Sequence, residues 1–127
     1  MQKFEDIVNN ASEGHKAVIS SQQIWPVLIS AAKNRQILRY STLQEITLKK
    51  SAIRYILGYI AYYCLENSLP AITVLVVNTT GEPGSGFDGF IAENIDLERE
   101  KVFSYDWYSI VPPTITELEQ AYAKHKN

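Results

Sequence analysis

The residues best suited to chemistry in this sequence are a cluster of cations near the middle of the chain. The stretch from residue 33 to residue 54 contains one acid, Glu45, and these cations: Lys33, Arg35, Arg39, Lys49, Lys50 and Arg54. From Glu82 onward acids outnumber bases, and the whole chain has a net charge of −2. A basic patch on a mildly acidic protein can bind phosphate locally, while the acidic remainder limits nonspecific attraction. The charge pattern therefore predicts a local phosphate-binding surface, or else an ordinary solvated face.

Catalytic residues are harder to find. His15 and His125 are the only histidines, and no local motif supplies either with a partner. We expect both at the surface, His15 in a turn and His125 near the C-terminus. The single cysteine, Cys64, lies on an apolar helical stripe, which predicts a buried structural thiol and excludes an internal disulfide or a cysteine zinc site. We therefore expect no metal and no cofactor, and these residues favour a function without catalysis while leaving an enzymatic one open.

The cations must be positioned by a central helix, predicted from Ser51 to Asn67. Apolar residues recur along it at steps of three and four: Ile53, Ile56, Leu57, Ile60, Ala61 and Cys64. Upstream, Ser41 and Gln44 form a capping-box pair that predicts a short helix over 42–47. Two helices joined by a tight basic turn are typical of a helix-turn-helix.

The chain after the central helix predicts a β-hairpin. Residues 71–77 form a continuous apolar, β-branched run that predicts a buried strand. A glycine-dense loop follows over 78–87, and residues 87–91 would return as a second strand. A helix predicted over 2–12, with Gly14 as its stop, and one over 21–34, with Ser20 as its N-cap, precede this core. Helices over 96–105 and 114–124 follow it, the second capped by Thr114 and Glu117. The residues between them that should pack on the body are Trp107, Tyr108, Ile110 and Val111. The expected fold is α+β: one winged helix-turn-helix-like domain, residues 1–127, with flanking N- and C-terminal helices.

A winged helix places the start of its second helix in a major groove of nucleic acid. The expected contacts to DNA or RNA follow from that geometry. Ser51, Arg54 and Tyr55 would reach bases, Tyr40, Lys49 and Lys50 would contact phosphates, and Gly84 and Ser85 would form the wing.

Several short segments of residues 39–90 occur in an order that matches a known family. They are Tyr40-Ser41-Thr42-Leu43, Arg54-Tyr55-Ile56-Leu57-Gly58, Asn67-Ser68-Leu69-Pro70, the apolar run 72–77 and the loop 81–87. This region resembles the C-terminal winged helix of the alkylguanine-DNA alkyltransferases and alkyltransferase-like proteins. The resemblance implies that Tyr40 lies near the phosphate backbone and that Arg54 takes the place of an arginine that replaces an extruded base. The reactive Pro-Cys-His-Arg segment of that family is missing, since Thr73-Val74-Leu75-Val76 stands in its place. The resemblance therefore implies DNA binding without alkyl transfer.

Two other functions stay open. Aromatic residues on and beyond the central helix either complete the core or form a protein-binding surface through Tyr59, Tyr62 and Trp107. A protein-binding surface would make the chain a small bacterial interaction module, such as an immunity or antitoxin-like protein. A small nuclease or toxin domain that uses His15 is the third reading. No apolar run is long enough to span a bilayer, and the first residues do not resemble a secretory signal, so the expected location is the cytoplasm.

Overall fold

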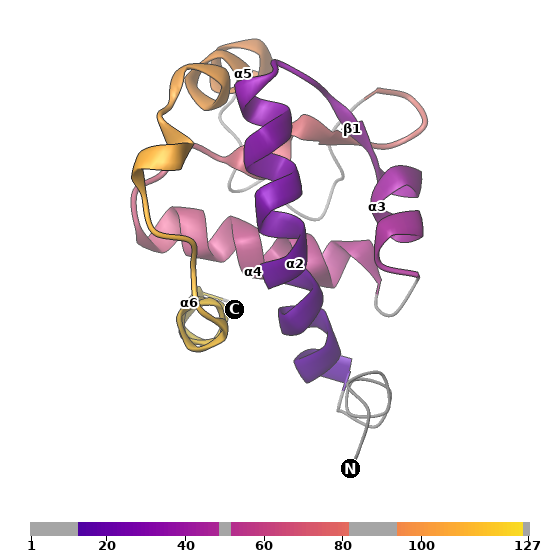
Figure 1. Ribbon diagram of the computed structural model, residues 1–127, viewed down its shortest axis with the longest axis vertical. Coiled ribbons are helices and arrows are strands. Elements are labelled where there is room, and N and C mark those ends of the chain that lie inside the picture. The colour runs from indigo at the N-terminus through magenta and orange to yellow at the C-terminus, as the bar shows by residue number, and fades with distance from the viewer. Residues whose placement is uncertain (1–12, 49–51, 82–93, 126–127) are drawn as a thin grey trace.

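The computed structural model describes residues 13–48, 52–81 and 94–125, and these residues form a mostly helical α+β structure (Figure 1). Its α-helices are α2 (Glu13–Lys33), α3 (Tyr40–Ile46), α4 (Ile53–Glu66), α5 (Ile95–Ser104) and α6 (Ile115–His125). Two short strands, β1 (Leu38–Arg39) and β2 (Val76–Val77), pair with each other, and two 3-10 helices are present, η1 (Ile72–Leu75) and η3 (Trp107–Ser109). None of the helices in the described ranges is long and apolar enough to cross a membrane.

The core forms where α2 crosses α4 (Figure 1). Trp25 of α2 is 1% exposed and meets Tyr63 of α4 and Trp107 of η3 edge to face. The hydroxyl of Ser21 lies 2.9 Å from the Ile56 carbonyl of α4 and 2.7 Å from the Ala17 carbonyl of its own helix. A single buried hydroxyl therefore ties the two helices together at their crossing.

Helix α2 is longer than predicted. It begins at Glu13, so Gly14 lies inside the helix and does not end an earlier one. Ser20, the predicted N-cap, is also inside the helix and buried. The capping prediction was wrong because the buried stripe already starts with Ala17 and Val18. The helix predicted over 2–12 lies outside the described residues.

Helix α4 is confirmed, since it spans Ile53–Glu66 and is buried continuously from Ile56 to Ala61. It contacts α2 on one side and α6 on another. The helix predicted over 42–47 is also present, but it starts at Tyr40, and Arg39 at its N-cap makes no side-chain capping hydrogen bond. The Ser41–Gln44 capping box was therefore wrong.

The strand predicted over 71–77 is mostly a 3-10 helix. Residues 72–75 form η1, and only Val76 and Val77 are extended. These two residues pair in parallel with Leu38 and Arg39. The run is buried throughout from Ala71 to Val77, and an element covered on all sides is apolar whether it is strand or helix. The return strand predicted over 87–91 lies outside the described residues.

The C-terminal helices lie close to their predicted positions. At the start of α6 the Thr114 and Glu117 side chains each accept a hydrogen bond from the other residue's backbone N–H, at 3.1 and 3.0 Å, which confirms that capping box. Trp107 is buried as expected. Tyr108 and Val111 were expected to pack on the body, but they are 60% and 82% exposed.

Candidate functional site

The residues at the junction of α3 and α4 form the surface that the sequence predicted to be functional. We call this surface the α3–α4 tip and define it by Ile46, Leu48, Arg54 and Tyr55. Arg54 is exposed in the first turn of α4, and its guanidinium carbon lies 5.3 Å from the centre of the Tyr55 ring. This spacing is typical of a cation–π contact. The tip therefore presents a cation and an aromatic ring held together.

The tip is held in place by what α4 buries behind it. Ile53 and Ile56 are both buried, so the first turn of α4 is fixed against the body on one side while Arg54 and Tyr55 face outward. α3 buries only Leu43 among its own residues, and its last residue, Ile46, is 48% exposed. The tip therefore combines the first turn of α4, which buried residues anchor to the body, with the end of a short helix that packs lightly on it.

The predicted site residues divide into two groups. Arg54 and Tyr55 lie together at the tip, and Tyr40 is half-buried at the start of α3, packed against the core. The remaining predicted residues lie outside the described ranges: Lys49, Lys50, Ser51, Gly84 and Ser85.

The cations of the basic stretch do not all belong to the tip. Arg35 pairs with Glu100 of α5 and lies 4.7 Å from the centre of the Phe103 ring, so its charge is used within the fold. Within the described ranges, Arg39 and Arg54 make no ion pair, and both are exposed. The described cations of this stretch that remain outside ion pairs are therefore Lys33 at the end of α2, Arg39 on β1 and Arg54 at the start of α4, and the one charged residue of α3 is Glu45.

Two residues of the tip were not singled out from the sequence. Leu48 is 75% exposed and has a backbone φ of 54°, in the left-handed region that a leucine rarely adopts. Ile46 lies two residues before it. A leucine next to two lysines, just past the end of a short helix, was the only signal in the sequence that could have pointed to this exposure.

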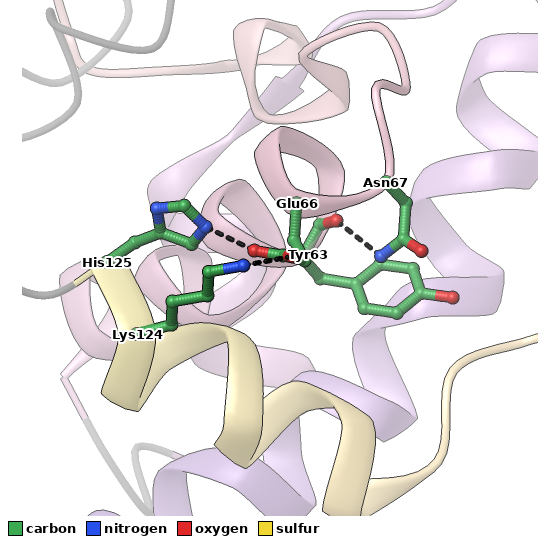
Figure 2. A network of polar contacts seen from close by, with 5 residues as sticks. All are labelled: Tyr63, Glu66, Asn67, Lys124 and His125. Carbon is green, nitrogen blue, oxygen red and sulfur yellow. Dashed lines mark hydrogen bonds and ion pairs between the residues drawn. The ribbon is translucent and has the colours of Figure 1, made fainter.

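A second surface feature lies where α4 and α6 end side by side (Figure 2). Glu66 at the end of α4 accepts a hydrogen bond from Lys124 at 2.7 Å, and its other oxygen lies 2.5 Å from His125 Nε2. A cleft of about 280 Å³ adjoins this contact; its lining residues are Tyr63, Glu66, Asn67, Glu117, Gln120, Ala121 and Lys124. His125 was expected only as a surface residue near the C-terminus. It instead takes part in a contact between the ends of α4 and α6.

The Glu66 contact fastens the end of α6. The hydrogen bonds from Lys124 and then from His125 hold the pKa of Glu66 below its usual value. The charged carboxylate therefore favours the folded arrangement above the ordinary pKa of a glutamate, and this contribution is lost as the pH falls through the lowered value.

Glu66→Gln should loosen the last turn of α6 without unfolding the protein. We expect faster amide hydrogen exchange of residues 122–125 at pH 6 and only a small change in Tm, because the carboxylate is at the surface. Glu119→Gln is the control, because it removes an acid from α6 itself and leaves the Glu66 contact in place. Equal exchange in the two variants would show that the Glu66 contact does not hold α6.

Residues 13–48, 52–81 and 94–125 contain no group of three His, Cys, Asp or Glu side chains that could hold a metal ion. Cys64 is fully buried, and His15 lies in α2 where a turn had been expected. Comparison of the chain with protein families, with curated proteins and with solved structures gave no match.

The aromatic residues proposed for a protein partner are mostly internal. Tyr59 is 8% exposed and stacks on Tyr122 of α6 at 4.3 Å, and Trp107 is 2% exposed. Tyr62 is half-buried between Tyr122 and His125. Tyr59 and Tyr62 complete the packing of α4 against α6, and Trp107 packs on Trp25 of α2, so Tyr59 and Trp107 offer little surface to a partner in the folded chain.

Proposed function

We propose that this protein binds nucleic acid, without chemistry, through the α3–α4 tip. The observation that carries the proposal is the exposed Arg54, which lies over Tyr55 in the first turn of α4 and has no acid beside it in that turn. Arginine is a strong ligand for phosphate and for base edges, and an aromatic ring beside it adds a stacking surface. In this proposal α3 and α4 are the two helices of the winged helix-turn-helix expected from the sequence, and the first turn of α4 provides the contact.

The distribution of charge supports this surface over others. Arg39 and Arg54 flank α3 at its two sides along the chain, and Lys49 and Lys50 lie between α3 and α4 in the sequence. Figure 1 shows α3 and the start of α4 on one side of the molecule and α5 and α6 on the other. Acids are concentrated on α5 and α6, in the first turn of each helix and beyond. A polyanion would therefore be attracted to one side.

The pairing of β1 with β2 brings the described residues that follow β2 to that same side. Because Arg39 is paired with Val77, the chain leaves β2 next to the first residue of α3. The turn over 78–81 lies on the α3 side in Figure 1. The proposal keeps the sequence-based expectation that Gly84 and Ser85, which lie outside the described residues, contact the sugar–phosphate backbone.

Removing Arg54 together with Lys49 and Lys50 should weaken nucleic-acid binding and reduce the dependence of that binding on salt. We expect Arg54→Ala combined with Lys49→Ala and Lys50→Ala to reduce the slope of log K against log salt by roughly one for each lost phosphate contact. Fluorescence anisotropy of labelled oligonucleotides, from about 50 to 200 mM salt, measures both quantities.

The matched control removes one cation from the opposite side. Lys101 of α5 has a side chain that is 56% exposed, so Lys101→Ala loses the same charge as Arg54→Ala without touching the tip. Nucleic-acid binding would be excluded as the function by either of two results. One is an affinity that does not change with salt concentration, and the other is an equal loss of affinity in Lys101→Ala and Arg54→Ala.

A protein-interaction module is the second candidate, and the segment from η3 to the start of α6 favours it. Tyr108 and Val111 are large apolar residues that are 60% and 82% exposed on this segment. Exposed aromatic residues are common at interface centres. The test is whether a stoichiometric companion copurifies from the native cells and is lost with Tyr108→Ser and Val111→Ser, while labelled oligonucleotides do not bind.

A further inference from the structure

Helix α4 exposes too little of its N-terminal half to read the bases in a major groove. A recognition helix places side chains from successive turns against base edges. From Ile56 to Ala61 every residue of α4 is buried, so its N-terminal half offers only Arg54 and Tyr55 beyond the capping residue. The α3–α4 tip can therefore touch nucleic acid with one turn of helix, and not with a helical face.

Three of the four side chains at the tip are apolar or aromatic, whereas a protein that recognises base edges in a groove places polar side chains there. Leu48, Ile46 and Tyr55 are 75%, 48% and 43% exposed. The left-handed backbone of Leu48 is uncommon for this residue type, and the Leu48 N–H donates to the Glu45 carbonyl at 3.2 Å, which closes the end of α3. Flat and aliphatic surfaces of this kind match the faces of bases and sugars, and only Arg54 among the described tip residues matches base edges or phosphates.

In a duplex the faces of the bases are stacked inside the helix and hidden from a protein. In a single strand they are accessible, and proteins bind them with aromatic rings set beside cations. We infer that the α3–α4 tip binds single-stranded nucleic acid, with one base stacked on the exposed part of the Tyr55 ring. This inference rests on the proposed function and narrows it to a class of ligand.

The geometry gives each side chain a part in this contact. Arg54 lies over the Tyr55 ring at 5.3 Å, so the base, the ring and the guanidinium form a layered arrangement. Leu48 and Ile46, at the end of α3, are exposed apolar residues that a base or sugar of the bound strand can contact. Arg39, which is exposed on β1 immediately before α3, accompanies the strand as a phosphate ligand.

The charge around the tip selects nucleic acid over a protein as the occupant. The tip itself carries Arg54, and the nearest cations along the chain are Arg39, Lys49 and Lys50, against the single acid Glu45. Apolar groups with Arg54 beside them and further cations close by in the sequence suit a polyanion with exposed flat rings. A protein partner would need a matching acidic rim, and it enters here as an outcome of the test.

The experiment compares four labelled ligands of one mixed sequence at the same salt: single-stranded DNA, single-stranded RNA, and the DNA and RNA duplexes. We expect one or both single strands to bind about 10-fold or more tightly than either duplex, and the two single strands show which sugar is preferred. Tyr55→Ala and Tyr55→Leu should each weaken single-strand binding by roughly 5- to 150-fold, since both lose the ring face, whereas Tyr55→Phe should stay within about 2-fold.

Tyr108→Ala is the matched control, because Tyr108 is a more exposed tyrosine outside the tip, and we expect it to bind like the parent protein. Tyr55 is partly exposed, so its variants should keep their Tm, and circular dichroism checks this. Duplex binding equal to or tighter than single-strand binding would overturn the inference and leave the proposed function standing. Parent-like affinity in Tyr55→Leu would overturn the stacking contact. No binding to any of the four ligands would overturn both proposals and leave the tip as a surface for a protein.

Discussion

Replacing Trp25 with alanine is expected to lower the free energy of unfolding by about 3–5 kcal/mol. The indole is 1% exposed, and its ring centre lies 5.7 Å from that of Tyr63 and 5.8 Å from that of Trp107. One side chain therefore joins α2, α4 and η3, and its removal leaves a cavity at their junction. A domain of this size has a total stability of about 5–15 kcal/mol, so the loss should be evident as a large shift in the urea midpoint.

Trp25→Phe and Trp107→Phe separate ring packing from hydrogen bonding. Trp25 Nε1 is buried and has no hydrogen-bond partner among the described residues, whereas Trp107 Nε1 donates to the Val102 carbonyl at 2.7 Å. We therefore expect Trp107→Phe to cost more than Trp25→Phe by about 1 kcal/mol. Tyr108→Ala is the exposed-aromatic control. A midpoint for Trp25→Ala close to that of Tyr108→Ala would mean that the three-ring contact does not stabilise the core.

The elements that could be predicted from the sequence are those specified by local signals. α4 was predicted within two residues at its start and one at its end, because its apolar stripe is continuous and Ser68-Leu69-Pro70 follows it. The reciprocal hydrogen bonds of Thr114 and Glu117 at the start of α6 involve residues three apart, so the pattern alone was sufficient.

The elements that could not be predicted depend on distant partners. Residues 71–77 are buried on every side, and Glu98 of α5 accepts a hydrogen bond from the Ala71 N–H at 2.8 Å, just before η1 begins. Burial of the whole run removed the alternation that distinguishes a strand with one solvated face. Pro26 also lies inside α2, since the packing of the helix outweighs the loss of one backbone hydrogen bond.

The candidate site shows the same division. The exposure of Arg54 follows from its place off the apolar stripe of α4, and the sequence predicted it. The exposure of Ile46 and Leu48 depends on how little of α3 packs on the body, which no local pattern reports. Glu66 and its partners Lys124 and His125 are 58 and 59 residues apart, so that contact could be recognised only in three dimensions.

Cys64 should be almost unreactive in the folded protein. Burial raises the pKa of its thiol from 9.0 to about 12, with a hydrogen bond involving the Ile72 backbone acting in the opposite direction and Glu98 adding to the increase. At pH 8 the thiolate fraction should be lower than in the unfolded chain by a factor of about 1000, and burial blocks access to the remainder. We expect labelling by a thiol reagent to be limited by unfolding in buffer and fast in concentrated urea.

The same pKa predicts how stability changes in alkaline solution. Below pH 9 both states keep the proton and Cys64 contributes no pH dependence; between pH 9 and about 12 only the unfolded chain releases it, so stability falls as the pH rises. Cys64→Ala removes this titration while leaving the tyrosines and lysines that also titrate in this range. The stability difference between the parent protein and Cys64→Ala should therefore shift against the parent by about 1 kcal/mol per pH unit above pH 9. Parallel pH profiles for the two proteins, or equal labelling rates in buffer and in urea, would show that the Cys64 thiol is accessible to solvent in the folded state.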